Sequence, residues 1–217
     1  MFNRPLCISR RSWLLAFLCV IPVAAYAGYK ARPWKPGAME SYPAQMSSQG
    51  VTIAVLPLHA DKLAEQVFDK KDMVTRGVMP VAVIVSNGND FPVRIEGETI
   101  QLVSGDGQFD TLSPCEAVAL VFKGDKAVYI GGPLPPIAVR KPAKPDALED
   151  FEHKFLGTRV VPPKTIVAGF LYYRVRGSDA AKDARIYIPR LLRMDGNSPL
   201  LFFEIDLLPA LSPPPPR

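Results

Sequence analysis

Few side chains in this sequence have the types and spacing that catalysis or metal binding requires. The two histidines are His59 and His153, and neither has a second ligand at the short spacing that is typical of zinc sites. The glycines at 105–107 and 131–132 do not match a phosphate-binding loop, and no Gly-x-Ser-x-Gly, kinase or Walker motif is present. The sequence therefore predicts no catalytic residue, no cofactor and no metal site.

Cys115 is the residue for which a chemical role is the clearest alternative to a purely structural one. Around it, Ser113, Pro114 and Glu116 supply an N-cap, a first helical residue and a capping-box partner, which together predict the start of a helix. A thiol in the first turn of a helix lies where backbone dipoles favour the thiolate, so Cys115 is a candidate reactive or redox-sensing thiol. We favour the other interpretation, a small buried hydrophobic residue, because no histidine or second cysteine is adjacent in sequence.

Acidic side chains cluster at 65–72 and at 149–152, but lysines are mixed into both stretches. Mixed charge on a short helix is typical of a solvated face with weak ion pairs. We therefore predict no acid–base chemistry there, and we place Asp150 and its acidic neighbours among the solvated groups. His153 is also expected to face solvent, since it lies on the other side of its helix from Phe151.

Aromatic residues concentrate in the last third of the chain, and three of them are candidates for a contact patch: Tyr172, Tyr173 and Tyr187. Tyr172 and Tyr173 are adjacent in a predicted strand and must point to opposite faces. One of them should leave the core unless both faces of the sheet are covered. The alternative is packing of the aromatic rings across strands, which we favour.

The first 27 residues have the organisation of a secretory signal peptide. Three arginines form a basic head, positions 13–25 are apolar, and Ala-Tyr-Ala at 25–27 is a small-x-small cleavage site. Cleavage after Ala27 would leave Gly28 as the first residue of the exported chain. The alternative is an uncleaved leader that anchors the protein, although the apolar run is shorter than the roughly 20 residues of a spanning helix. The export route is left open between general secretion and the twin-arginine system.

Removal of this leader changes the charge and the cysteine content. The leader holds three of the 26 basic residues and no acidic residue, so 23 basic residues remain against 21 acidic ones, a net charge of +2. A nearly neutral chain gives no support for nucleic-acid binding. Two of the three cysteines also lie in the leader, so Cys115 alone remains and an intramolecular disulfide is excluded.

The rest of the chain predicts short strands with few helices. Residues 28–49 contain three prolines and predict a flexible lead-in. Alternating apolar residues predict strands at 51–56, 81–86, 91–95, 99–103, 127–130, 170–175, 186–188 and 200–207. Short helices are predicted after Asp61, Ser113 and Asp146. Asn87-Gly88 is a strong two-residue turn signal, so 80–95 is predicted to be a β-hairpin.

This number and spacing of strands predicts a mainly β protein, an immunoglobulin-like β-sandwich with two or three short helices in the connections. The sandwich domain is expected to span 50–208 and to be followed by a disordered proline-rich tail at 209–217. Five prolines between 131 and 145 indicate a stiff connector or a docking segment for a partner, and we favour the connector.

The order of these segments resembles a group of known proteins. The stretches "GVTIAV", "GVMPVAVIVSNGNDFPVRI", "VPPKTIVAGFLYYRV", "ARIYIPRL" and "LLFFEIDL" follow one another in the manner of uncharacterised bacterial exported proteins with an immunoglobulin-like domain. The resemblance covers about 50–207. Pro162-Pro163-Lys164 stands where Pro-Gly is expected, so the turn there departs from the pattern. The resemblance implies an exported, non-enzymatic domain whose ligand is unknown.

The sequence thus predicts a non-catalytic exported module of the bacterial cell envelope that binds an envelope protein or a cell-wall component through a sheet face or an exposed edge. Two alternatives stay open: an envelope enzyme or redox sensor that uses Cys115, and a protein anchored by an uncleaved leader. Membrane contact is expected only through that leader, and nucleic acid is not expected as a partner.

Overall fold

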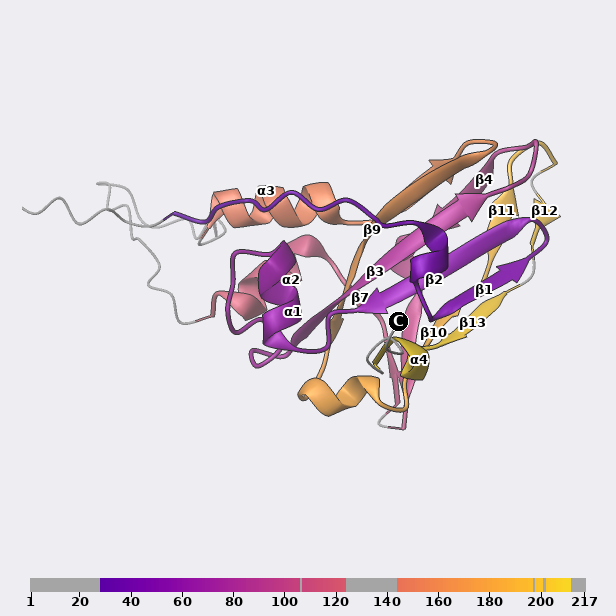
Figure 1. The fold of residues 1–217 in the computed structure, drawn as a ribbon. Helices are drawn as coiled ribbons and strands as arrows, with labels where there is room; N and C mark the ends of the chain where they lie inside the picture. The colour runs from indigo at the N-terminus through magenta and orange to yellow at the C-terminus, as the bar shows by residue number, and fades with distance from the viewer. Residues whose placement is uncertain (1–27, 106, 124–143, 197, 201, 212–217) are drawn as a thin grey trace, which may run out of the picture.

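The computed structural model describes residues 28–105, 107–123, 144–196, 198–200 and 202–211, and Figure 1 shows how they are arranged. Within these residues the chain forms three antiparallel sheets and a few short helices. The prediction of a mainly β protein with short helices in the connections is confirmed. The predictions for the signal peptide at 1–27, the strand at 127–130, the prolines before residue 144 and the tail from 212 lie outside the described residues. The prediction of a disordered tail is wrong for 209–211, which belong to the short helix α4 (Leu208–Leu211).

The largest sheet has the order β1-β2-β3-β9-β7. Its strands are β1 (Gln45–Ser48), β2 (Val51–Pro57), β3 (Val78–Asn87), β9 (Thr165–Arg174) and β7 (Thr111–Leu112). β3 and β9 pair along their full length, from Val78 opposite Arg174 to Asn87 opposite Thr165. β3 is buried at nine of its ten positions, because it is a central strand with other elements packed on both of its faces. This explains why its sequence is apolar nearly throughout rather than alternating.

The two other sheets each have four strands. One has the order β13-β10-β5-β6, formed by β13 (Phe203–Asp206), β10 (Arg185–Ile188), β5 (Gln101–Ser104) and β6 (Gly107–Phe109). The other has the order β12-β11-β4-β8, formed by β12 (Ser198–Pro199), β11 (Leu191–Arg193), β4 (Val93–Glu96) and β8 (Thr158–Val161). In β13, Phe203 and Ile205 are buried while Glu204 and Asp206 are exposed, as the alternation of the sequence predicts.

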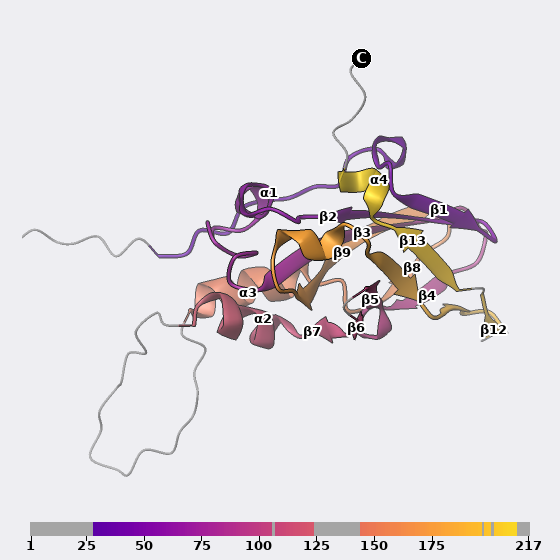
Figure 2. The same ribbon diagram turned by 90° about the horizontal axis from the view of Figure 1, so that it is seen from below.

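The helices connect the strands. They are α1 (Asp61–Val67), α2 (Pro114–Val121), α3 (Pro145–Lys154) and α4 (Leu208–Leu211), with 3-10 turns η1 (Met39–Ser41), η2 (Gly97–Thr99) and η3 (Ser178–Ala181). Figures 1 and 2 show α1, α2 and α3 gathered at one end of the large sheet. The capping box at the start of α2 is confirmed: Glu116 N–H donates to the Ser113 hydroxyl, and the Glu116 carboxylate accepts from Ser113 N–H.

A glycine in β9 lets the backbone that follows α3 approach the backbone of β9 closely. Leu156 N–H donates to the carbonyl oxygen of Phe170 at 3.0 Å. A Cβ atom on Gly169 would lie 2.7 Å from the Leu156 Cα, which is closer than non-bonded carbons approach. Glycine is therefore required at position 169 for α3 to return onto β9.

The hairpin predicted around the Asn-Gly step is wrong. β2 and β9 occupy the two edges of β3, so β3 has no edge free for β4. β4 instead pairs with β8 and β11 in a different sheet. The turn therefore carries the chain from one sheet to the next.

Asn87 organises this corner from a buried position. Its side-chain Nδ2 donates to the carbonyl oxygen of Phe91 at 2.8 Å. It also donates to the carbonyl oxygens of Val161 at 3.1 Å and Pro162 at 3.2 Å. Its Oδ1 accepts from the backbone N–H of Asn89 at 3.1 Å. One amide group thus ties the end of β3 to the start of β4 and to the turn between β8 and β9.

The predicted lead-in over 28–49 is part of the fold. β1 pairs with β2 from Gln45 to Ser48, and the Trp34 ring packs edge-on against Phe170 with centroids 4.6 Å apart. Figure 1 shows the chain after residue 28, in indigo, running alongside α3. The prediction fails because a proline-rich stretch without internal periodicity can still be held by apolar side chains that pack on a core formed elsewhere.

None of the helices in the described part of the chain is both long enough and apolar enough to cross a membrane.

Asn87→Ala should lower the free energy of unfolding by about 2–3 kcal/mol, because it leaves buried carbonyl groups without their donor. The matched control is Asn89→Ala, in the same turn, which removes one exposed hydrogen bond to the Gln49 carbonyl and should cost less than about 1 kcal/mol. Urea denaturation followed by circular dichroism measures both. Equal losses in the two variants would contradict the role assigned to Asn87.

Candidate functional site

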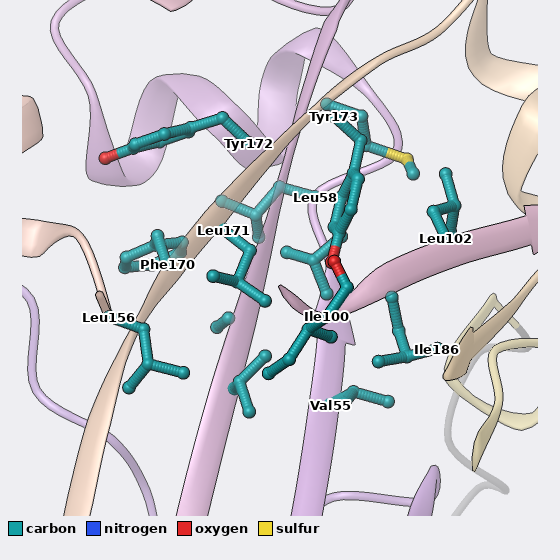
Figure 3. Packing of buried hydrophobic residues seen from close by; sticks show 14 of the residues in the cluster. Val55, Leu58, Ile100, Leu102, Leu156, Phe170, Leu171, Tyr172, Tyr173 and Ile186 are labelled. Carbon is teal, nitrogen blue, oxygen red and sulfur yellow. The ribbon is translucent and has the colours of Figure 1, made fainter. Parts of the chain in front are cut away.

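Tyr172 and Tyr173 do not form a contact patch. Both are fully buried, and Figure 3 shows their rings on opposite sides of β9. The Tyr172 ring stacks on Phe151 of α3 at 5.0 Å, and its hydroxyl donates to the Phe151 carbonyl oxygen. The Tyr173 hydroxyl donates to the carbonyl oxygen of Ile100 at 3.2 Å. The candidate contact patch is wrong for these two residues because helices cover one face of β9 and a second sheet covers the other. The favoured expectation of buried aromatic packing is confirmed for Tyr172, although its stacking partner Phe151 lies on α3 rather than on a neighbouring strand.

Tyr187 remains partly accessible. It lies on the outer face of β10, between the inward-facing Ile186 and Ile188. Its ring lies 6.1 Å from that of Phe202, which is exposed. The predicted row of surface tyrosines is therefore reduced to one tyrosine and a neighbouring phenylalanine.

Cys115 is exposed in the first turn of α2, so the favoured prediction of a buried cysteine is wrong. The reason is visible in the helix: Ala117, Val118 and Val121 form its buried face, and position 115 lies away from that face.

The histidines do not form a metal site. His153 is exposed and lies 3.8 Å from Glu149, whereas the half-buried His59 contacts the Pro57 carbonyl oxygen. In the described part of the chain, no three His, Cys, Asp or Glu side chains are close enough to share a metal ion.

Asp150, predicted on a solvated face, is buried and forms the most connected polar cluster. Lys154 Nζ donates to both of its carboxylate oxygens, at 2.7 and 2.6 Å, and the Tyr29 hydroxyl donates to Oδ2 at 2.6 Å. Lys154 Nζ also donates to the Val67 carbonyl oxygen at 2.9 Å and lies 4.8 Å from the centre of the Phe68 ring. The sequence prediction fails because the segment that covers Asp150 comes from 121 residues earlier in the chain.

The polar groups of this cluster are engaged with one another and with the backbone. Burial lowers the pKa of Lys154, although the Asp150 carboxylate opposes that shift, and burial together with the hydrogen bond to Asp150 raises the pKa of Tyr29. An ammonium group has three N–H donors, and all three of Lys154 have protein acceptors. The cluster thus joins the start of the described chain to α1 and α3 and leaves no donor free for a substrate.

A different group of basic residues converges at the other end of the β3–β9 pair. Because Val78 lies opposite Arg174, the residues before 78 lie beside the residues after 174. The hydrogen bond from Val175 N–H to the Gly77 carbonyl oxygen, at 2.9 Å, extends this pairing. Arg76 is thereby brought next to Arg174 and Arg176. Alternation along the strand places Arg174 and Arg176 on one face, with Val175 buried between them.

These residues line a cleft of about 540 Å³, which we call the arginine cleft. Its polar side consists of Arg76, Arg174, Arg176 and Thr75, and its apolar side of Phe109 from β6, Leu120 from α2 and Val175. A neighbouring hollow of about 490 Å³ shares Thr75 and Arg176 with it and is also lined by Asp61.

The charge of the arginine cleft is only partly compensated. Arg76 Nε donates to the Asp72 carboxylate at 2.6 Å, and its Nη1 donates to the Lys123 carbonyl oxygen at 2.7 Å. Burial raises the pKa of Asp72, but hydrogen bonds from Arg76 and Lys70 outweigh it and lower that pKa overall. Arg174 and Arg176 are exposed and form no ion pair within the described residues.

Two positive charges are therefore available in a concave site with an apolar wall, which is an arrangement suited to binding an anion. Guanidinium groups stay protonated in proteins, so these arginines can bind an anion but are poor general bases. Sequence analysis missed it. The Arg-Val-Arg step at 174–176 was a local signal, but the approach of Arg76 follows only from the pairing of β3 with β9.

No family model matches the chain, and no curated protein matches it. Among solved structures, the chain is similar to the crystal structure of "a putative lipoprotein (ycdA)" from Bacillus subtilis subsp. subtilis str. 168, with 15% sequence identity and a TM-score of 0.36. The match covers 76% of this chain and 39% of that chain. A likeness at this level says nothing about ligand or activity.

Asp150→Ala should lower the free energy of unfolding by about 3–4 kcal/mol, because it leaves the partly buried Lys154 charge without its partner. The double variant Asp150→Leu with Lys154→Met should recover most of that loss, since it removes both charges. Glu149→Ala, at an exposed neighbouring position, serves as the control and should change stability by less than about 0.5 kcal/mol. A double variant as unstable as Asp150→Ala would refute this view of the cluster.

The exposed Cys115 thiol should be alkylated by iodoacetamide in the native protein, within about threefold of the rate for glutathione at neutral pH. Mass spectrometry of the intact protein measures the rate, with Cys115→Ser as the blank. Reaction only after denaturation would contradict the exposed position. A rate far above that of glutathione would support the alternative of a reactive or redox-sensing thiol.

Proposed function

We propose that this protein is an exported, non-catalytic binding domain of the bacterial cell envelope, built on an immunoglobulin-like sandwich, and that it holds an anionic ligand in the arginine cleft. The observation that carries the proposal is the pair of guanidinium groups, Arg174 and Arg176, which line a concave site and form no ion pair with any other described residue. A single ion pair on the protein surface usually contributes little free energy. Several guanidinium groups that line one site can instead bind an oxyanion in a fixed geometry.

Export is supported by the sequence of the leader and by the residues that follow it. The leader carries a basic head, an apolar run and a cleavage signal before Gly28. Immediately after that signal, the Tyr29 hydroxyl bonds to Asp150, and Lys30 N–H donates to the Asp69 carboxylate at 2.9 Å. The exported chain would thus be held to the domain from its second residue onward.

A non-catalytic role is supported by the chemistry of the cleft. Its lining consists of arginines, a threonine, glycine and apolar residues, and the Thr75 hydroxyl already donates to the Asp61 carboxylate at 2.5 Å. Among the described residues, neither a free carboxylate nor an imidazole lines the larger cleft, so none of them can act as a general base beside a bound anion. Binding, rather than turnover, is the function that these side chains support.

Isothermal titration of the mature protein with pyrophosphate at low salt tests the proposal. We expect saturable binding that weakens about tenfold or more in the double variant Arg174→Gln with Arg176→Gln. The control is Arg185→Gln with Arg190→Gln, which removes the same charge from exposed positions in β10 and in the connection between β10 and β11. Absence of binding to pyrophosphate, inorganic phosphate and citrate, or equal weakening in both variants, would overturn the proposal.

A further inference from the structure

We infer that the ligand of the arginine cleft is a phosphate monoester that carries an apolar group. This inference rests on the proposed function, because it names the class of anion that the cleft would hold. It adds two requirements that anion binding alone does not make: a dianionic head and an apolar body attached to it.

The requirement for a dianionic head follows from the positive charges of the cleft that form no ion pair within the described residues. Arg76 is already engaged, because it forms an ion pair at 2.6 Å with Asp72, a carboxylate that Lys70 also contacts at 3.2 Å. Arg174 and Arg176 remain, and together they supply two positive charges. A phosphate monoester carries about −1.5 to −2 charge at pH 7 and three acceptor oxygens. A carboxylate or a phosphate diester carries a single negative charge and leaves one guanidinium group uncompensated.

The position of the head is set by the acidic residue of the neighbouring hollow. The Asp61 carboxylate accepts from Val74 N–H at 2.7 Å and from Thr75 N–H at 3.2 Å, so it is held in place there. Its negative charge would repel an anion on that side of Thr75. The phosphate group is therefore expected in the larger cleft, between Arg174, Arg176 and the side chain of Arg76.

The requirement for an apolar body follows from the apolar residues that line the cleft together with the arginines. Phe109 in β6, Leu120 in α2 and Val175, which directly follows β9, all line the cleft. Phe109 and Leu120 are half-buried, so each retains apolar surface that a ligand could cover. Each methylene group buried against such a surface contributes up to about 0.8 kcal/mol, which corresponds to about fourfold in affinity.

Two sources can supply this chemistry: a soluble phosphate monoester and the headgroup of a phosphatidic-acid-type lipid. The test titrates the mature protein with inorganic phosphate, hexyl phosphate and methyl hexyl phosphate, which is the matching diester with one charge. Binding to phosphatidylcholine vesicles with and without phosphatidic acid is measured by co-sedimentation. The cleft variant Arg174→Gln with Arg176→Gln and the control Arg185→Gln with Arg190→Gln are measured in parallel.

Hexyl phosphate should bind at least about tenfold more tightly than inorganic phosphate and about tenfold more tightly than the diester. Both preferences should be lost in the cleft variant and kept in the control. Co-sedimentation with phosphatidic acid would assign the lipid as a source, and its absence alongside tight hexyl phosphate binding would assign a soluble ester.

Several results would overturn the inference. Equal affinity for the monoester and the diester would exclude the dianionic head. Equal affinity for inorganic and hexyl phosphate would exclude the apolar body. In both cases binding that depends on the cleft arginines would leave the proposed function standing, whereas absence of any anion binding would remove both.

Discussion

The full-length antiparallel pairing of β3 with β9 is the interaction on which the other features of this structure depend. Ten residues of each strand are in register, and both strands are apolar on two faces near their centres. A shift by one residue would exchange the faces of every side chain. The observed register sends Tyr172 toward the helices and Tyr173 toward a second sheet, and it sets Arg76 beside Arg176 at one end and Asn87 beside the β8–β9 turn at the other.

Local signals in the sequence predicted local structure well. The capping box at Ser113 is present, β13 alternates as expected, and strands occur close to the predicted positions. The capping box and the alternation each depend on a few adjacent residues, whose side chains largely determine the backbone geometry. The Asn-Gly step shows the limit, because a turn signal predicts a change of direction but not which strand will be the neighbour. Here Asn87 donates to three carbonyl groups of other segments, and the chain enters another sheet.

The burial of Asp150 and the arginine cleft were not predictable because they depend on contacts distant in sequence, whereas the exposure of Cys115 follows from its local position on α2. Asp150 was expected in solvent because its helix carries mixed charge, yet Tyr29 covers it from far away in the sequence. Cys115 was expected to be buried from residue type alone, although its place on the helix leaves it exposed. The arginine cleft arises from strand pairing, since only the register of β3 and β9 brings Arg76 to Arg174 and Arg176. Asp72 in turn pairs with Arg76, one of the three arginines, and also with Lys70.

The most direct test of this topology is nuclear Overhauser contact between backbone protons of the isotope-labelled mature protein. The pairing of β3 with β9 requires contacts between Val81 and Leu171, Val83 and Gly169, and Val85 and Val167. Contacts that instead join 81–85 to 91–95 would establish the hairpin suggested by the Asn-Gly step. That result would contradict the register, and with it the position of every residue assigned to the cleft.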